Sequence, residues 1–254
     1  MMKRAGLPWP LLAVAGWLLA VGSAGAEERV DPTAVATPPA VTAVVELFTS
    51  QGCSSCPPAD HLLSTYAERP DTLALAWHVD YWNYLGWRDT FSRAAHSDRQ
   101  RGYAQRMESG VFTPQVVVNG SAQAVGSRGP DVARLTRDAR SMPLLPLRVV
   151  RDGGRIGVTL SGTAAERARA EGAVLTLVRY ERVARVVIDR GENRGRAITY
   201  RNVVRTVEPV ARVIGGRMRA ELTIAMPRGE GCALVLQAAG DDGPGPILAA
   251  AVLE

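Results

Sequence analysis

The sequence has little cysteine, almost no lysine and no long apolar run. Three cysteines among 254 residues are too few for the disulfide-dense scaffold of a small secreted domain. No apolar run reaches the roughly 20 residues of a membrane-spanning helix. A Gly-rich phosphate loop, a G-x-S-x-G elbow and an H-E-x-x-H helix are also missing. The sequence therefore does not favour a nucleotide-binding protein, a serine hydrolase or a zinc protease.

The basic residues are nearly all arginines, because Lys3 is the only lysine. The formal net charge is +5 and the pI is about 9.5, values that would suit a nucleic-acid-binding protein. The arginines are scattered, however, with no block of five or six like charges and no interleaved stacking aromatics. We therefore expect no nucleic acid among the partners.

The composition is that of a globular protein, with 46% hydrophobic and 22% charged residues and a mean hydropathy near zero. The first 26 residues have the pattern of an export signal: the positive residues Lys3 and Arg4, an apolar run over Leu11–Val21, and a small-x-small cleavage site ending at Ala26. We predict a cleaved Sec-type signal peptide over 1–26 and a secreted or periplasmic protein. No membrane association is expected beyond this signal.

Residues 27–40 are rich in Pro, Ala and Thr and are predicted to be a flexible N-terminus of the mature chain. Residues 41–143 alternate apolar strands with helices, which indicates an α/β domain. Its expected strands are Val41–Thr49, Thr72–Asp80, Thr113–Val118 and Ser121–Val125, and its expected helices start near residues 58, 90 and 129.

Residues 144–254 have a different pattern, with seven short β-rich runs separated by turns. These runs are Leu147–Val150, Ile156–Leu160, Val174–Tyr180, Val183–Ile188, Ala197–Val204, Met218–Ile224 and Ala233–Ala238. Their number and spacing predict a second, β-sandwich-like domain beyond a boundary near residue 143.

Two of the three cysteines form a C-x-x-C motif between a predicted strand and a predicted helix. This spacing allows Cys53 and Cys56 to form a disulfide. At a helix start, the N–H groups and the helix dipole favour thiolate, the species that attacks in disulfide exchange. We predict Cys53 as the attacking residue and Cys56 as the resolving residue. No cofactor is expected.

Two prolines follow the motif directly. A residue before proline is pushed away from the α region, so the helix is expected to start only at Pro58. Both cysteines would then lie in a loop, with Cys53 further from the helix dipole and therefore less acidic than in a typical redox enzyme.

The motif lies in the segment VVELFTSQGCSSCPPAD, which is followed by HVDYWNYLGW and VFTPQVVVNG, and GENRGRAITYRNVVR occurs over Gly191–Arg205. Together these segments resemble a family of exported thioredoxin-like proteins known as domain of unknown function 1223. The resemblance implies a thioredoxin-like fold for the N-terminal domain, with Cys53 and Cys56 matching the redox pair. Pro114 then matches a proline that is cis in such folds and that, with Thr113, orients a bound peptide. The sequence alone does not determine its isomer.

An aromatic insertion with Tyr81, Trp82 and Trp87 follows the second predicted strand, whose last residue is Asp80. These side chains could line a substrate groove beside the cysteines. The alternative is that they cap the sheet edge and form an interface with the second domain.

Glu46 is an acidic residue within an otherwise apolar strand. Thioredoxin-like proteins often have an acidic group beneath the active site, and a buried carboxylate could accept a proton from the resolving thiol. A hydrogen-bonded structural role is the alternative. Cys232 is left over and is expected to be a buried free cysteine, with pairing to another chain as the alternative.

The leading functional hypothesis is an exported thiol–disulfide oxidoreductase that acts on protein thiols and disulfides. One alternative is a non-catalytic periplasmic binding module with a structural disulfide. Another is a Cu(I)-handling protein, because two thiolates suit Cu(I). The possible further ligands are His61, His78, His96 and Met107, but no second C-x-x-C and no H-x-x-x-H spacing supports them. We therefore predict no metal site, and the oligomeric state is left open.

Overall fold

The structure is a computed structural model that describes residues 40–152, 154–240 and 243–253, all within one compact unit, 38–254. The predicted signal peptide, 1–26, lies outside the described residues, as does the predicted N-terminus 27–40 up to residue 39. In the described ranges, no helix is both long enough and apolar enough to cross a membrane.

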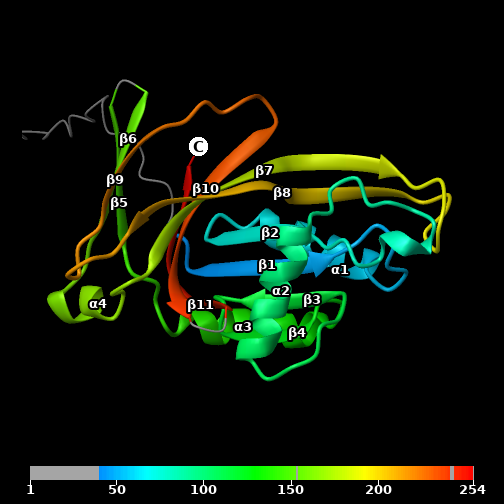
Figure 1. The fold of residues 1–254 in the computed structure, drawn as a ribbon, viewed down its shortest axis with the longest axis horizontal. Coiled ribbons are helices and arrows are strands. Elements are labelled where there is room, and N and C mark those ends of the chain that lie inside the picture. Colours follow the sequence, from blue (N-terminus) through cyan, green and yellow to red (C-terminus); the bar gives the residue numbers. More distant parts are fainter. Residues whose placement is uncertain (1–39, 153, 241–242, 254) are drawn as a thin grey trace, which may run out of the picture. The chain divides into compact units, whose positions relative to one another are not determined.

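A mixed eight-stranded sheet forms the centre of the described structure, in the order β11-β10-β7-β8-β2-β1-β3-β4 (Figure 1). Its strands are β1 (Ala43–Thr49), β2 (Thr72–His78), β3 (Gln115–Val118), β4 (Ala122–Val125), β7 (Val174–Val187), β8 (Ala197–Arg212), β10 (Glu230–Gly240) and β11 (Gly243–Leu253). A separate three-stranded sheet contains β5 (Leu147–Asp152), β6 (Arg155–Leu160) and β9 (Arg219–Thr223). The helices are α1 (Pro57–Ala67), η1 (Asn83–Leu85), α2 (Ala94–Arg106), α3 (Gly129–Arg140) and α4 (Ala164–Ala168).

Strand β1 is fully buried because it is an inner strand of this sheet. It pairs in parallel with β2 and antiparallel with β3. Alternate side chains of β1 point to opposite faces. Val45 and Leu47 pack with α1 and α3, whereas Val44 and Phe48 pack in the cluster that contains Tyr103 of α2. Helices thus cover β1 on both faces of the sheet.

The C-terminal half of the chain extends the same sheet. Strand β8 pairs with β2 through Ala76 and Val203 and continues antiparallel along β7. Val204, Val235 and Ile247 pack in one cluster with Val44 of β1. The structure therefore differs from the expected division near residue 143, because backbone pairing at the edge of β2 and the apolar core both cross it.

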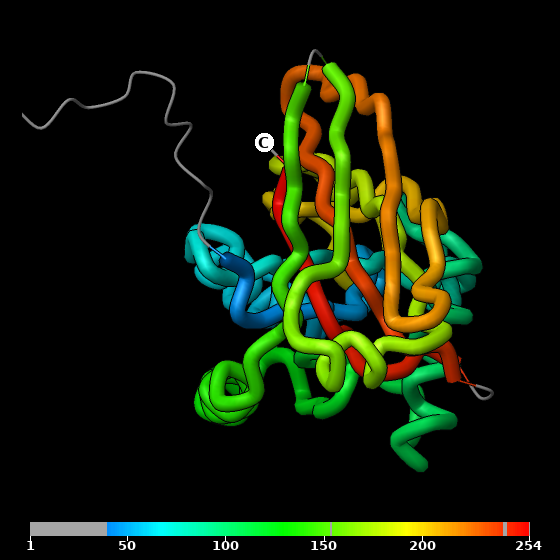
Figure 2. The backbone as a smooth tube through the Cα atoms, turned by 90° about the vertical axis from the view of Figure 1, so that its left-hand side faces the viewer, coloured from blue at the N-terminus to red at the C-terminus, as the bar shows by residue number. Residues whose placement is uncertain are grey.

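Among the described strands, β5, β6 and β9 stand apart from the large sheet, and Figure 2 shows the β5–β6 hairpin (green) beside β9 (orange). Val158 and Leu160 pack against Leu175 of β7 and Leu234 of β10. The expected sandwich-like packing is therefore limited to this corner. Cys232 is a free cysteine that is fully buried in the same cluster.

Candidate functional site

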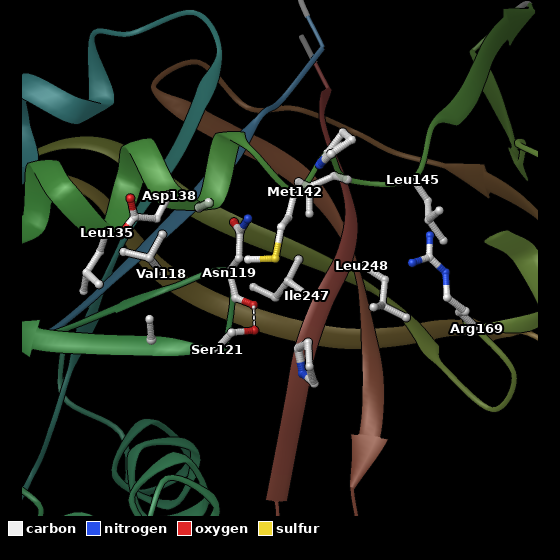
Figure 3. Close-up of a pocket in the computed structure, with 15 residues that line it drawn as sticks. Val118, Asn119, Ser121, Leu135, Asp138, Met142, Leu145, Arg169, Ile247 and Leu248 are labelled. Atoms are coloured by element: carbon white, nitrogen blue, oxygen red, sulfur yellow. Dashed lines mark hydrogen bonds between the residues drawn. The ribbon is translucent and has the colours of Figure 1, made fainter.

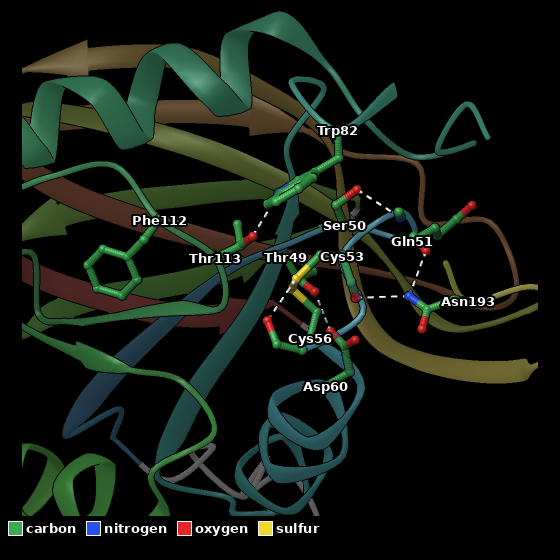
Figure 4. Close-up of a disulfide and its surroundings, with 12 residues drawn as sticks. Thr49, Ser50, Gln51, Cys53, Cys56, Asp60, Trp82, Phe112, Thr113 and Asn193 are labelled. Carbon is green, nitrogen blue, oxygen red and sulfur yellow. Dashed lines mark hydrogen bonds between the residues drawn. A yellow bond between two sulfur atoms is a disulfide. The ribbon is translucent and has the colours of Figure 1, made fainter. Parts of the chain in front are cut away.

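The Cys53–Cys56 disulfide is present and lies at the carboxyl end of β1, directly before α1 (Figure 4). Its Cα atoms are 5.4 Å apart. The helix begins at Pro57, one residue earlier than expected, and Cys56 is its N-cap in an α conformation. The N–H groups of Ala59 and Asp60 donate to the Cys56 carbonyl at 2.8 and 3.1 Å, and these bonds hold Cys56 at the helix start despite the proline that follows.

Both cysteines are almost completely shielded from solvent. Cys53 is 2% exposed and Cys56 is 0% exposed, whereas Ser54 and Ser55 between them are exposed. The Ser55 hydroxyl lies 3.4 Å from Cys53 Sγ. The motif therefore presents its serines rather than its sulfurs to solvent.

The Thr113–Pro114 peptide bond is cis, and Thr113 is one of the residues around the disulfide in Figure 4. The Thr113 hydroxyl accepts a hydrogen bond from Trp82 Nε1 at 2.8 Å. Trp82 also lies against Gly52, where an added Cβ would be 3.2 Å from the Trp82 Cβ. Trp82 and Thr113 are therefore hydrogen-bonded to each other beside the cysteine loop.

The other residues predicted from the aromatic insertion divide between two places. Trp87 Nε1 donates to Gln51 Oε1 at 2.8 Å, next to the cysteine loop. Tyr81 donates instead to Gln100 of α2 at 3.0 Å, and Asp80 accepts from Ser97 of α2 at 2.5 Å. Trp82 and Trp87 thus contact the loop that precedes Cys53, whereas the polar groups of Asp80 and Tyr81 fasten the insertion to α2.

Glu46 has the hydrogen-bonded structural role that was the alternative to proton transfer at the cysteines. Its carboxylate is buried, accepts from Arg99 Nε at 2.8 Å and from the Tyr103 hydroxyl at 2.6 Å, and lies on the α2 face of the sheet. The cysteines are followed by α1, which packs on the opposite face. Glu46 is therefore not the acid beside the resolving cysteine.

The acidic group near the disulfide is Asp60, in the first turn of α1. Its Oδ1 accepts from the Thr49 hydroxyl at 2.8 Å, and its Oδ2 has no hydrogen-bond partner among the described residues. Burial raises the pKa of Asp60 to about 7, although the nearby His78 and the Thr49 hydrogen bond oppose the shift. A carboxyl group with this pKa can take up or release a proton near neutral pH.

A polar network continues from Asp60 on the α1 face of the sheet. His78 is level with Thr49 on the adjacent strand, and its Nδ1 lies 2.7 Å from the buried Asp89 carboxylate. Burial raises the pKa of Asp89, but the interaction with His78 and the hydrogen bonds from the Gln51 and Phe91 N–H groups together outweigh it, and the net pKa is lowered. His78 Nε2 and the Tyr200 hydroxyl are buried and, among the described residues, have no hydrogen-bond partner. The ring centroids of His78 and Tyr200 lie 4.7 Å apart.

The residues considered as metal ligands are not gathered around the cysteines. His78 is paired with Asp89, and His96 Nδ1 lies 2.9 Å from the His78 carbonyl. Burial lowers the pKa of His96 to about 4. Over the described ranges, no group of three or more His, Cys, Asp or Glu side chains is arranged to hold a metal ion.

An apolar cavity of about 310 Å³ lies away from this site (Figure 3). It is lined by residues that include Val118, Asn119, Met142 and Ile247. Asn119 bonds to Val44 at the start of β1, so the cavity is at the opposite end of that strand from the disulfide. The cavity and the disulfide are therefore separate features.

Sequence reasoning missed Asp60 and Asn193 as members of the site. Asn193 lies in the loop between β7 and β8 and donates to the Cys53 carbonyl at 2.8 Å. Asn193 belongs to the segment Gly191–Arg205, and the resemblance of that segment to the family was the signal that could have identified it. The signal for Asp60 was weaker: it is the one acidic residue on the helix that follows the motif.

Comparison with known proteins gives a family. A crystal structure of an Agrobacterium tumefaciens protein, from the Northeast Structural Genomics Consortium, is 32% identical with a TM-score of 0.72, covering 85% of this chain and 96% of that one. The structure of HBP35 of Porphyromonas gingivalis is similar in fold, with 10% identity, a TM-score of 0.56 and coverage of 85% and 75%. A search of curated proteins found no match. A family model matches residues 44–237, and the chain therefore belongs to the family described as Protein of unknown function (DUF1223).

Proposed function

We propose that this protein is a thiol–disulfide oxidoreductase with a thioredoxin-like unit built from β1, α1, β2, β3, β4 and α3. The observation that carries the proposal is the Cys53–Cys56 disulfide at the start of α1. The cis bond before Pro114 and the buried carboxyl group of Asp60 support it, because each lies close to this motif in the fold. Protein thiols and disulfides are the proposed substrates.

The proposed reaction is a reversible exchange. A substrate thiolate attacks Cys53 Sγ, a substrate–Cys53 disulfide forms, and the Cys53–Cys56 bond breaks with its electron pair going to Cys56. A second substrate thiolate then attacks the substrate sulfur of the mixed disulfide and releases Cys53 as a thiolate. The substrate dithiol loses two electrons and two protons, and the protein disulfide gains them. The reverse sequence reduces a substrate disulfide.

Asp60 is the proposed proton donor and acceptor for Cys56. Its backbone N–H already bonds to the Cys56 carbonyl, and its pKa of about 7 lies near the operating pH. A protonated Asp60 can give its proton to the Cys56 thiolate as that sulfur leaves, and can take it back when the disulfide reforms.

One observation favours a second candidate, a binding module with a structural disulfide. Both cysteines are buried, and a nucleophile must reach Cys53 Sγ for exchange to occur. A disulfide that closes so short a loop removes little chain entropy, which makes stabilisation a weak reason for its presence. We therefore place the redox function first.

The reduction potential of the Cys53–Cys56 pair tests the choice. We expect a value between about −270 and −120 mV after equilibration with graded glutathione buffers and trapping by alkylation. Cys56→Ser is expected to accumulate a mixed disulfide at Cys53, and Cys232→Ser to behave as the unmodified protein. A potential below about −300 mV would instead identify a structural disulfide.

We also propose that the protein is exported and works in the periplasm or outside the cell. The support is the N-terminal pattern of a positive region, an apolar run and a small-x-small site in the sequence. Such compartments permit disulfides to persist, which agrees with the proposed chemistry. Mass spectrometry of the chain after expression in an exporting host would detect cleavage after Ala26, and an intact N-terminus would contradict the proposal.

A further inference from the structure

The end of the β7–β8 hairpin reaches the cysteine loop from a part of the chain 140 residues away. Asn193 in this end is 0% exposed. Its Nδ2 donates to the Gln51 carbonyl at 2.9 Å and to the Cys53 carbonyl at 2.8 Å (Figure 4). One side-chain amide therefore holds the two carbonyl groups on either side of Gly52.

The hairpin end is itself fastened at several points. Gly195 donates to the Ile188 carbonyl at 2.7 Å, and Ile188 donates to the Arg196 carbonyl at 2.9 Å. Gly191 has φ of +77°, and an added Cβ there would lie 3.2 Å from the Trp87 Cβ. The backbone that carries Asn193 is therefore held in place beside the cysteine loop.

These contacts bear on the stability of the disulfide. When the bond is reduced, the two sulfurs must move apart to van der Waals contact. Cys56 is fixed at the start of α1, so much of the adjustment falls on the loop that contains Cys53. Contacts made in the oxidised geometry and weakened on reduction favour the oxidised state. The Asn193 hydrogen bonds are made to this loop in the oxidised geometry, one of them to Cys53 itself.

We propose that Asn193 is a positioning residue for disulfide exchange: by holding the Gln51 and Cys53 carbonyls it stabilises the oxidised pair and slows attack on Cys53. This inference rests on the proposed function. It also assigns a role to the C-terminal half of the chain, which supplies this contact to a motif in the N-terminal half.

The test compares the full chain with Asn193→Ala and Asn193→Asp. Neither variant retains the amide donor, and Asp keeps the side-chain shape. At a net worth of about 1 kcal/mol for one hydrogen bond, we expect both variants to shift the glutathione equilibrium at least about fivefold toward the reduced form. Reduction by glutathione should also accelerate. Asn193→Gln keeps an amide donor and is expected to lie closer to the unmodified protein.

A matched control is available in the same hairpin. Asn202 Nδ2 donates to the Ala74 carbonyl at 2.9 Å, so a side-chain amide also joins this hairpin to the neighbouring strand β2. Its φ is +50°, and Asn202→Gly removes this bond without straining the backbone. We expect this variant to lower the melting temperature and to leave the glutathione equilibrium unchanged.

The outcomes separate this inference from the proposed function. If the unmodified protein exchanges with glutathione and the Asn193 variants match it within twofold, the inference is overturned while the function stands. An equal shift in Asn202→Gly would also overturn it, since general loosening would then explain the effect. If the unmodified pair does not exchange at all, the proposed function fails. Asn193 is then judged by the rate at which a stronger reductant, dithiothreitol, reduces the disulfide, where a faster reduction in both variants supports its role and an unchanged rate refutes it.

Discussion

At the scale of single residues, position relative to the sheet decides which acid lies beside the disulfide. Glu46 and Asp60 are both buried, but Glu46 is paired with Arg99 on the α2 face. Asp60 lies on the α1 face, with a pKa that burial raises to about 7. Of these two acids, Asp60 is the one that contacts the Cys56 backbone, and its pKa lies near neutral pH.

This raised pKa predicts a pH-dependent stability. From about pH 4 to pH 7 the unfolded chain loses the Asp60 proton while the folded chain keeps it, so rising pH favours unfolding. The full effect is roughly 4 kcal/mol. Asp60→Asn removes this term. We therefore expect the stability of the variant relative to the unmodified protein to increase from pH 4 to pH 7 and then to stay constant.

Urea unfolding of the oxidised proteins at a series of pH values measures this difference. Asp138→Asn is the matched control, since Asp138 is an exposed helical acid with Arg134 as its partner at 3.6 Å. This variant removes a carboxylate without removing a buried one, so a pH dependence found only for Asp60→Asn belongs to the buried acid. If the difference in stability between Asp60→Asn and the unmodified protein does not change with pH, Asp60 has an ordinary pKa.

At the scale of elements, Gly126 marks the place where β1, α1 and the start of β3 meet. An added Cβ would lie 2.9 Å from Leu47 Cδ1, 3.2 Å from the Ala59 Cβ and 3.3 Å from the Pro114 Cβ. Gly126 also donates to the Pro114 carbonyl at 2.9 Å. The absence of a side chain here allows α1 and the cis-proline turn to approach the same strand.

Gly126→Ala is therefore expected to destabilise the protein by about 1–3 kcal/mol through overpacking. Gly110→Ala is the control, because an added Cβ there meets nothing within 4 Å. The control should be neutral or stabilising by up to about 1 kcal/mol. Denaturant midpoints measure both changes, and equal midpoints for the two variants would show that the packing around Gly126 can relax.

At the scale of the whole molecule, the C-terminal half completes the core of the N-terminal half. Val203 and Tyr200 pack in the same cluster as α1, and Arg99 of α2 donates to Gln237 of β10 at 2.9 Å. A fragment ending at residue 143 would expose the edge of β2 and lose these contacts.

We therefore expect the fragment 40–143 to lack a cooperative unfolding transition under conditions where 40–254 has one. Circular dichroism during urea unfolding distinguishes the two cases, with the disulfide intact in both chains. A sharp transition in the fragment at the midpoint of the longer chain would instead establish an independent N-terminal domain.

The sequence by itself determined the local parts of the site. A buried strand, a C-x-x-C turn and a helix follow one another directly, so the disulfide was predictable from neighbours in the chain. The start of α1 was misjudged by one residue, because the steric preference of Cys56 before proline was outweighed by two hydrogen bonds to its carbonyl.

Only the tertiary structure decided which distant groups complete the site. Alternation along β1 places Glu46 and Leu47 on opposite faces, but nothing local states which face α1 covers. The pKa of Asp60 depends on its burial and on His78 of β2, and Asn193 of the β7–β8 loop donates to the Cys53 carbonyl. These groups come from separate strands and loops, and their approach is set by packing of the whole sheet rather than by any local preference.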